Sequence, residues 1–310
     1  MELIRNLSDL DTRYHDCVAT IGNFDGFHLG HQAVLKQLRT CADDLNLPVT
    51  VMVFEPQPLE FFDPDKAPSR LTRWREKYQL LRDHGVDRMI CIRFNAQLAA
   101  LSAEDFVVNL LLGKVGVRHL LIGDDFRFGQ GRKGDYDLLC NLSHKHGFKV
   151  ERSKTFLIDN KRVSSSRIRT ALETGDLDQA ARLLGRRYSI SGRVAHGNKQ
   201  GRALGFPTAN IELRRMKTAL KGIFVANVVL QDQPAQPSIA YIGTKPTLGG
   251  TRSILEAHLF DFTGDLYGQY IKVEFLKKLR DDKKFDSFEI LREQIALDAK
   301  MAREYFLENE

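Results

Sequence analysis

The segment Cys17-Val-Ala-Thr-Ile-Gly-Asn-Phe-Asp-Gly-Phe-His-Leu-Gly-His31 decides the fold of the first half of the chain. Its apolar start, Cys17–Ile21, is typical of a buried strand, and a helix is predicted to begin at about Gly30. Between them, Asp25-Gly26 indicates a tight turn. A strand that leads through a short turn into a helix is the unit from which helix-covered parallel sheets are built.

The same alternation of strands and helices continues to about residue 185. Further strands are predicted at Val49–Phe54, Arg88–Ile92, His119–Ile122 and Phe148–Glu151, and helices at about 73–84, 103–112, 135–146 and 175–184. Apolar strands separated by helices predict a doubly wound α/β domain with a parallel sheet. Ligands of such a domain bind beyond the carboxyl ends of its strands.

The pattern of predicted elements changes after Arg187. Strands are predicted at Tyr188–Ala195, Gly222–Leu230, Ser238–Ile242, Ile254–Phe262 and Tyr270–Phe275, with turn residues between them. Because no helix intervenes, this half is predicted to be a small antiparallel barrel or sandwich. We place the domain boundary near 185, which gives domains 1–185 and 186–310.

A C-terminal helix follows the last of these strands. Asp286 is predicted to cap it, with Glu289 as the reciprocal partner. One apolar stripe is predicted to pack on the barrel: Phe288, Leu291, Ile295, Ala299, Ala302 and Phe306.

Composition excludes some classes of protein and leaves the partner open. Of 310 residues, 43% are hydrophobic and 28% charged, as in ordinary globular proteins. The net charge of +6 is spread over both halves and fits nucleic acid or small phosphorylated ligands equally well. No apolar run approaches the roughly 20 residues of a membrane helix, and the N-terminus does not resemble a signal peptide.

The four cysteines lie far apart in the first half. No CxxC pair occurs among Cys17, Cys41, Cys91 and Cys140, which argues against zinc ribbons and thioredoxin-like sites. We expect buried free thiols in a reducing compartment, and therefore a cytoplasmic protein.

His28 and His31 lie one turn apart at the positive end of the first predicted helix. Imidazole donors and backbone N–H groups there can bind phosphate oxygens. The neighbouring candidates in the same loop are Gly22, Phe24, Asp25 and Gly30. The alternative is a pair of surface histidines at a helix start.

A second candidate phosphate-binding element precedes the helix that ends at Gly175. Ser164, Ser165 and Ser166 offer hydroxyls at a helix N-terminus, and Arg167 or Arg169 adds a guanidinium. The alternative is an ordinary N-cap followed by a basic helix.

The segment Gly123–Gly129 follows a predicted strand. Asp125 and Arg127 provide a carboxylate and a cation there, and Phe126 and Phe128 could stack on adenine or flavin or belong to the core.

The second half carries a glycine-rich loop and a polar segment. Gly197, Gly201 and Gly205, with Arg202, suit phosphates, although an ordinary hairpin loop is the alternative. After Pro207, the side chains of Thr208 and Asn210 point to one side if the chain is extended. Two neutral oxygen ligands of this kind can hold Mg²⁺ together with ATP phosphates, and a polar turn is the alternative.

Glu256 lies on a predicted strand, on the opposite face from Leu255 and Ala257. Its carboxylate could accept a proton from an attacking hydroxyl, whereas His258 is interpreted as structural.

The pair of motifs in the first half, His28-x-Gly30-His31 and Ser164-Ser-Ser-Arg-Ile-Arg169, resembles the nucleotidylyltransferase superfamily. The segments Phe54–Phe62, Arg70–Lys77 and Gly123–Gly129 are similar to the adenylyltransferase half of bacterial bifunctional riboflavin kinase/FAD synthetases. Gln57 stands where that family commonly has His.

The second half resembles the riboflavin kinase module of the same family along essentially its full length, most clearly in Gly192–Asn210 and around Glu256. The resemblance implies that Thr208 and Asn210 hold Mg²⁺ and phosphate and that Glu256 is the catalytic base. It implies ATP-dependent conversion of riboflavin to FMN in the second half. In the first half, it implies adenylylation of FMN to FAD with release of pyrophosphate, where His28, His31 and Arg169 stabilise charge.

Three alternatives stay open at this point. The first half could belong to a nucleic-acid-binding protein, because class I aminoacyl-tRNA synthetases also contain HxGH, although no KMSKS-like segment occurs. The chain could be a flavin or nucleotide sensor without catalysis, or only one half could be active. We expect small-molecule partners, no nucleic acid, no membrane, and a monomer or weak homo-oligomer.

Overall fold

The structure is a computed structural model that describes residues 1–196, 205–213, 217–230, 233–247 and 250–309. It contains two compact units, Met1–Pro68 with Arg73–Ser164, and Ser69–Thr72 with Ser165–Glu310. Each unit is described by itself. The predicted site residues Gly197, Gly201 and Arg202 lie outside the described residues.

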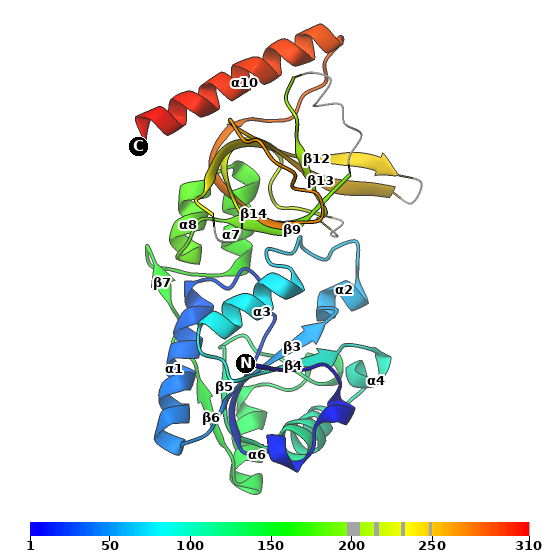
Figure 1. Ribbon diagram of the computed structural model, residues 1–310. Helices are drawn as coiled ribbons and strands as arrows, with labels where there is room; N and C mark the ends of the chain where they lie inside the picture. Colours follow the sequence, from blue (N-terminus) through cyan, green and yellow to red (C-terminus); the bar gives the residue numbers. More distant parts are fainter. Residues whose placement is uncertain (197–204, 214–216, 231–232, 248–249, 310) are drawn as a thin grey trace. The chain divides into compact units, whose positions relative to one another are not determined.

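The first unit is built on a six-stranded parallel sheet (Figure 1). Its strands are β1 (Glu2–Ile4), β2 (Cys17–Ile21), β3 (Val49–Glu55), β4 (Arg88–Arg93), β5 (Val117–Ile122) and β6 (Lys149–Arg152). Their spatial order is β1-β4-β3-β2-β5-β6, and every pairing is parallel. The predicted α/β class is confirmed, and five of the six strands lie where the apolar runs place them.

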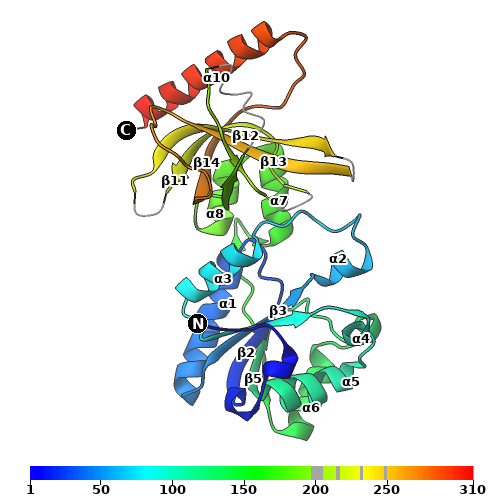
Figure 2. The same ribbon diagram turned by 45° about the vertical axis from the view of Figure 1, so that its right-hand side comes forward.

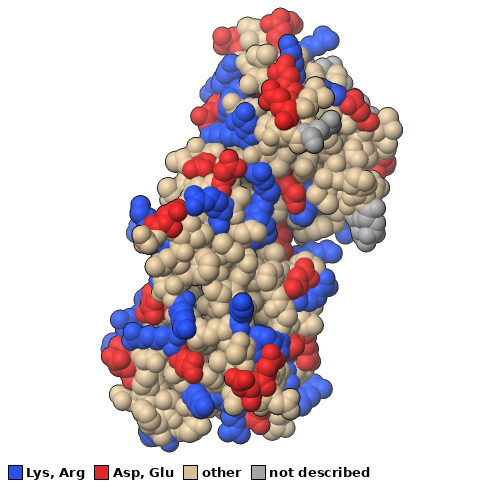
Figure 3. Space-filling model, turned by 90° about the vertical axis from the view of Figure 1, so that its left-hand side faces the viewer, with Lys and Arg blue, Asp and Glu red and all other residues tan. Residues whose placement is uncertain are grey.

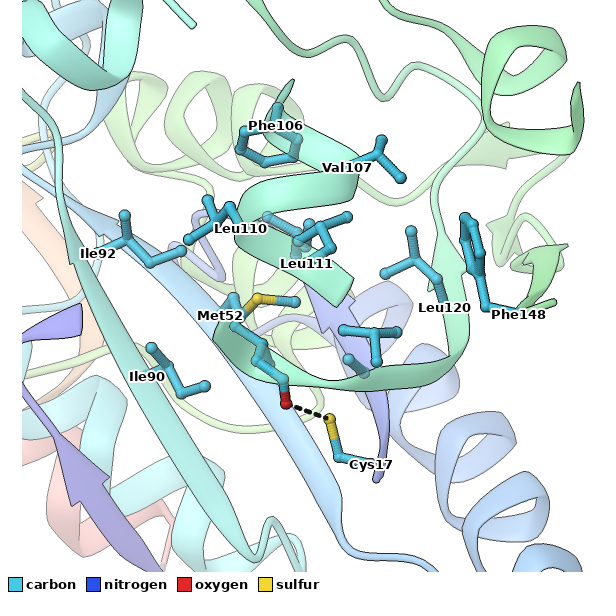
Figure 4. Packing of buried hydrophobic residues seen from close by; sticks show 14 of the residues in the cluster. Cys17, Met52, Ile90, Ile92, Phe106, Val107, Leu110, Leu111, Leu120 and Phe148 are labelled. Atoms are coloured by element: carbon cyan, nitrogen blue, oxygen red, sulfur yellow. Dashed lines mark hydrogen bonds between the residues drawn. The ribbon is translucent and has the colours of Figure 1, made fainter. Parts of the chain in front are cut away.

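Helices cover both faces of this sheet, as a doubly wound fold requires. They are α1 (Leu29–Leu45), α2 (Pro58–Phe62), α3 (Trp74–Asp83), α4 (Ala96–Ala99), α5 (Ala103–Asp105), a π-helix (Phe106–Val115) and α6 (Tyr136–His146). The core splits accordingly, because Cys17 and Ala19 of β2 pack with the π-helix while Val18 packs with α1. Figure 4 shows the first of these cores, where Leu110 and Leu111 of the π-helix lie among sheet residues that include Met52.

The strand order reverses between β2 and β5. From β2 the chain adds β3 and then β4 on one side, whereas β5 and β6 extend the other side. Loops that leave two such neighbouring strands run in opposite directions and open a crevice at the carboxyl edge of the sheet. The Gly22–His31 segment follows β2 and the Gly123–Gly129 segment follows β5, so both predicted binding loops start at this crevice.

The second unit contains a closed antiparallel barrel (Figure 2). Its strands are β9 (Ser189–Ala195), β10 (Ala209–Ile211), β11 (Gly222–Val229), β12 (Gln236–Thr247), β13 (Gly250–Leu259) and β14 (Tyr270–Arg280). Their order is β10-β13-β12-β11-β14-β9, and the pairing of β10 with β9 closes the barrel. On β13, Ser253, Leu255, Ala257 and Leu259 are buried, whereas Glu256 is half-buried.

Helices α7 (Ser165–Thr174) and α8 (Leu177–Leu184) pack with the barrel unit, where α8 contacts β14. The structure divides the two units at Ser164/Ser165, and the predicted boundary at 185/186 stays a prediction. Among the described residues, no helix is both long and apolar enough to cross a membrane. The four cysteines are free, but only Cys17 is fully buried, so the expectation of buried thiols was wrong for the other three.

The C-terminal helix α10 (Phe288–Glu308) lies on the outer face of the barrel. Its N-cap is Ser287, whose hydroxyl accepts a hydrogen bond from the backbone N–H of Ile290, and the prediction of Asp286 as the cap was wrong. Ala299 and Ala302 of the predicted stripe are buried. Phe288 is 63% exposed because it stands at the first turn, beyond the barrel surface that the later turns cover.

An ion pair fixes α10 to the end of β14. The guanidinium of Arg280 donates from Nε to Oδ1 of Asp298 at 3.0 Å and from Nη2 to Oδ2 at 2.7 Å. Asp298 is 2% exposed, and Gln294 also donates to it at 2.9 Å. A buried carboxylate with paired donors from a guanidinium fixes the orientation of both elements.

Replacing Asp298 by Ala should therefore destabilise the barrel unit. Because the change leaves the Arg280 guanidinium without its buried carboxylate, we expect a loss of about 3 kcal/mol in the free energy of unfolding. The measurement is urea unfolding of the full chain, followed by circular dichroism. The matched control is Glu304→Ala, which breaks the exposed pair with Lys300 on the same helix and should cost less than about 1 kcal/mol. Equal losses in the two variants would contradict this account.

Candidate active sites

The loop after β2 has a tightly constrained backbone. Phe24 and Phe27 have φ values of 46° and 42°, and Gly26 between them has a φ of 81°. Positive φ at a bulky residue costs about 1–3 kcal/mol and persists only where the surroundings hold it. Both phenylalanine rings are buried, at 3% and 0% exposure, and their burial holds the backbone in this conformation. The loop therefore delivers the next residue, His28, in a fixed orientation.

His28 is the N-cap of α1. Its Nδ1 accepts a hydrogen bond from the backbone N–H of His31 at 3.3 Å. The bond needs the lone pair of Nδ1, so the proton of the neutral ring is on Nε2. The cap satisfies one N–H of the first turn, and the remaining N–H groups of such a turn favour an anion.

The His31 ring is held between its neighbours. It stacks on His28 with centroids 3.7 Å apart and an interplanar angle of 14°, and its centroid lies 4.8 Å from that of Phe24. The structure thus brings His28, His31 and Phe24 together in one cluster, as the sequence predicts.

Gly30 permits a close approach between this cluster and the strand-like segment before α7. A Cβ at Gly30 would lie 3.1 Å from the His28 ring and 3.3 Å from the carbonyl oxygen of Val163. Ser164 follows Val163 directly, so the serine motif begins beside the first turn of α1. Ser165 and Ser166 form the first turn of α7, which belongs to the other unit.

Arg169 also lies on α7. Its Nε donates to the carbonyl oxygen of Ser69 at 2.7 Å, within the second unit. This bond orients the guanidinium.

Asp125 and Arg127, at the carboxyl end of β5, form ion pairs with different partners. Asp125 accepts from Arg162 at 2.8 Å, and this hydrogen bond is the main cause of the lowered pKa of Asp125. Arg127 pairs with Asp135, the N-cap of α6, at 2.9 Å. Both pairs are substantially exposed and can exchange with a ligand at low cost.

The aromatic residues of this segment belong to the core. Phe128 is 5% exposed and packs against Phe106, and Phe126 stacks on Phe128 with centroids 5.5 Å apart. Of the two interpretations from the sequence, the structure supports the core role.

In the second unit, the candidate metal ligand and the candidate base face each other across two strands. Asn210 of β10 is the direct antiparallel partner of Glu256 of β13. Directly opposite residues project to the same face of a sheet with their side chains adjacent. Asn210 donates from Nδ2 to the carbonyl oxygen of Thr208 at 3.4 Å, which directs its Oδ1 away from that carbonyl.

Glu256 has a second neighbour, Tyr241 of β12, which is its partner on the other side. The Tyr241 hydroxyl donates to Asp282 at 2.7 Å. Burial is the main cause of the raised pKa of Tyr241, and the bond to Asp282 and the charges of Asp282 and Glu256 add to it. The phenol therefore stays protonated and can act as a donor.

His258 supports the segment that carries Thr208. Its Nδ1 lies 2.8 Å from the carbonyl oxygen of Pro207, and its ring packs edge-on against Phe206. This contact fits the structural role expected from the sequence. Gly205, with a φ of 87°, starts the same segment in a conformation that favours glycine.

Sequence reasoning missed Arg162 and Tyr241. Arg162 lies on β8 (Lys161–Arg162), which pairs with β7 (Leu157–Ile158) through Asp159-Asn160, both with φ of 55°. That dipeptide is a signal for a tight hairpin and could have located Arg162. Tyr241 meets Glu256 only through the register of β12 with β13, which the sequence does not reveal.

Comparisons with known proteins agree with this geometry. A family model described as FAD synthetase matches residues 10–167, and one described as riboflavin kinase matches residues 184–306. The chain is 47% identical over 307 residues to a protein of Escherichia coli K12 named bifunctional riboflavin kinase/FMN adenylyltransferase, covering 99% of this chain and 98% of the relative.

A relative of the same name from Pseudomonas fluorescens is 46% identical, over 98% of this chain and 97% of its own length. A crystal structure described as a macrolide-efflux protein from Streptococcus pneumoniae has the same fold, with a TM-score of 0.82 and 30% identity. That match covers 98% of this chain and 99% of the other.

The raised pKa of Tyr241 can be tested directly. We expect its phenol to ionise well above the ordinary tyrosine value of about 10, and Asp282→Asn to lower that pKa by removing an anion. Because the folded-state pKa lies above the unfolded value, the associated stability is present below about pH 10 and is lost as pH rises further. The measurement is a tyrosinate absorbance titration of wild type minus Tyr241→Phe. A phenol that ionises at or below the ordinary value would contradict the assignment.

Proposed function

The chain belongs to the family of bifunctional riboflavin kinase/FMN adenylyltransferases, and on this basis we propose which residues carry each reaction. The C-terminal half phosphorylates riboflavin to FMN with ATP, and the N-terminal half adenylylates FMN to FAD with release of pyrophosphate. The substrates are small molecules: riboflavin, FMN and ATP. The roles of individual residues below are our proposals.

For the kinase reaction we assign Glu256 as the base. The 5′-hydroxyl oxygen of riboflavin bonds to the γ-phosphorus of ATP, the bond from that phosphorus to the β,γ-bridging oxygen breaks, and ADP leaves. The hydroxyl proton passes to the Glu256 carboxylate. Tyr241 is the neighbour of Glu256 on β12, and its hydroxyl donates to Asp282. The pairing of Asn210 with Glu256 is the observation that supports this site most directly.

Thr208 and Asn210 suit the Mg²⁺ that this family uses. They offer a hydroxyl and an amide carbonyl, which are hard neutral oxygen donors, and both side chains are half-buried beside the Glu256 strand. When bound, Mg²⁺ supplies neutralisation of phosphate charge. Pro207 fixes the entry of the chain into this segment, and Gly197, Gly201, Arg202 and Gly205 are proposed to contact the ATP phosphates.

For the adenylyl transfer we assign charge stabilisation to the loop after β2. An FMN phosphate oxygen attacks the α-phosphorus of ATP, and the bond to pyrophosphate breaks. Because FMN is already an anionic nucleophile, the protein needs only to align the reactants and stabilise charge. We propose that His28 donates from Nε2 to a phosphate oxygen, and His31 lies stacked beside it. Ser164, Ser165, Ser166 and Arg169 are proposed to bind the triphosphate as well.

The remaining residues of the first half complete this proposal. Gly22 and Gly30 allow close approach of the ligand, and Asp25 is buried at 2% exposure within the loop. Asp125 and Arg127 are proposed to bind the nucleotide in exchange for their present ion pairs. We place the division between the two activities at 185/186.

The expected partners follow from the charge distribution. On the face shown in Figure 3, Lys and Arg are interspersed with Asp and Glu, which is unlike the basic stripe of a nucleic-acid-binding surface. We propose an enzyme that binds no nucleic acid or membrane, acts as a monomer or weak homo-oligomer, and works in the cytoplasm, where free thiols persist.

Glu256→Gln tests the kinase assignment. Removal of a general base should lower riboflavin phosphorylation by about 10²- to 10⁴-fold. Conversion of supplied FMN to FAD should change less than about twofold, because that reaction uses other residues. Both rates are measured by chromatography of flavin products. Glu274→Gln, on β14 of the same barrel, is the matched control. If both reactions fall equally in a folded Glu256→Gln protein, the assignment is wrong.

His31→Ala should give the reverse pattern. Loss of one group that stabilises transition-state charge should lower FAD formation from FMN by about 10²- to 10³-fold, while FMN formation persists. The exposed His144→Ala on α6 is the control. Normal FAD formation in His31→Ala would remove His31 from the site, and loss of FMN formation would show that the two sites are not separate.

A further inference from the structure

A second constellation of ligating side chains lies on the first unit, outside the phosphate-binding loop. Cys41 of α1, His119 of β5 and Glu151 of β6 place one ligand atom each within 4.8 Å of the others. No other group of three such residues occurs among the described parts of the chain. His119 is the sheet partner of Lys149, so Glu151, two residues further along β6, projects to the same face.

His119 is the most buried of the three residues. Its residue exposure is 3%, and its Nε2 has no hydrogen-bond partner among the described residues. The nearest carboxylate oxygen, Oε1 of Glu151, lies 3.4 Å from Nε2 but without hydrogen-bond geometry. Because an unsatisfied buried polar atom costs about 1–3 kcal/mol, a ligand at Nε2 would stabilise the fold.

Cys41 adds a thiol to the cluster formed by His119 and Glu151. It is half-buried on α1, and its Sγ lies within 4.8 Å of His119 and Glu151 ligand atoms. A divalent cation binds a thiolate and a carboxylate together and releases the thiol proton. The Glu151 side chain is 49% exposed, which gives an ion a route from solvent.

The distances fit a small tetrahedral ion. Zinc bonds of about 2.0–2.3 Å place neighbouring ligand atoms roughly 3.3–3.8 Å apart. The His119–Glu151 distance of 3.4 Å already lies in that range. Cys41 needs a shift of about an ångström, within the reach of a side-chain rotation. Sulfur and imidazole donors favour Zn²⁺ over Mg²⁺.

We propose that Cys41 Sγ, His119 Nε2 and the Glu151 carboxylate form a Zn²⁺ site, with a solvent water as the fourth ligand. Cys41 follows His31 by ten residues on α1, a separation of about 15 Å along the helix axis. The ion would therefore bind away from the reacting phosphates. It would link α1 to β5 and β6, so its role is to stabilise the first unit.

Cobalt(II) provides a spectroscopic probe of this site. Metal-free full-length protein is titrated with Co²⁺ in the presence of excess Mg²⁺, which occupies oxygen-only sites. We expect a thiolate-to-cobalt charge-transfer band and intense tetrahedral d–d bands that saturate at one equivalent and disappear when Zn²⁺ is added. Cys41→Ser should abolish the charge-transfer band, and Cys140→Ser, which changes another half-buried helical thiol, should retain it.

Two further variants separate ligation from folding. Glu151→Gln changes a largely exposed side chain and should weaken Zn²⁺ binding at least tenfold, while the melting temperature without metal stays unchanged. Zn²⁺ should raise the melting temperature of the wild type and of Cys140→Ser. In a folded His119→Gln protein, Zn²⁺ should raise the melting temperature only weakly. A wild-type protein without the charge-transfer band, or a band that persists in Cys41→Ser, would overturn the proposal.

Discussion

The parallel pairing of β2 with β3 on one side and with β5 on the other is the constraint on which the first site depends. Because of this pairing, the loops that leave β2 and β5 run in opposite directions, and a crevice opens at the carboxyl ends of these two strands. The loop that leaves β2 bends through positive φ at Phe24 and Phe27, and the burial of both rings holds it. The position of His28 at the start of α1 follows from that turn.

In the barrel, the corresponding constraint is strand register. Asn210, Glu256 and Tyr241 lie in one row across β10, β13 and β12, while Leu255 and Ala257 point to the buried side. A slip of one residue in β13 would exchange these faces and bury Glu256. Closure of the barrel through β9 and β10 removes the free edge at which such a slip is easiest.

The sequence predicts the features of the fold that depend on short-range patterns of residues. Apolar runs located β2 and its neighbours, and the HxGH spacing located the first turn of α1. It could not choose between Asp286 and Ser287 as a cap, because both residue types can cap and packing of the later helix decides. Strand β1 is too short to show a pattern. The pairing of Asp125 with Arg162 joins residues 37 positions apart, and only the folded chain reveals it.

The central claim is that each reaction is complete within its own half of the chain. The most direct test mixes two variants, Glu256→Gln, which is impaired in riboflavin phosphorylation, and His31→Ala, which is impaired in FAD formation. The mixture is supplied with riboflavin, ATP and Mg²⁺. The account predicts that the mixture forms FAD, because FMN made by one protein is adenylylated by the other, whereas neither protein alone forms it at an appreciable rate. A mixture of the two folded variants that accumulates FMN without FAD, or that forms neither, would contradict it.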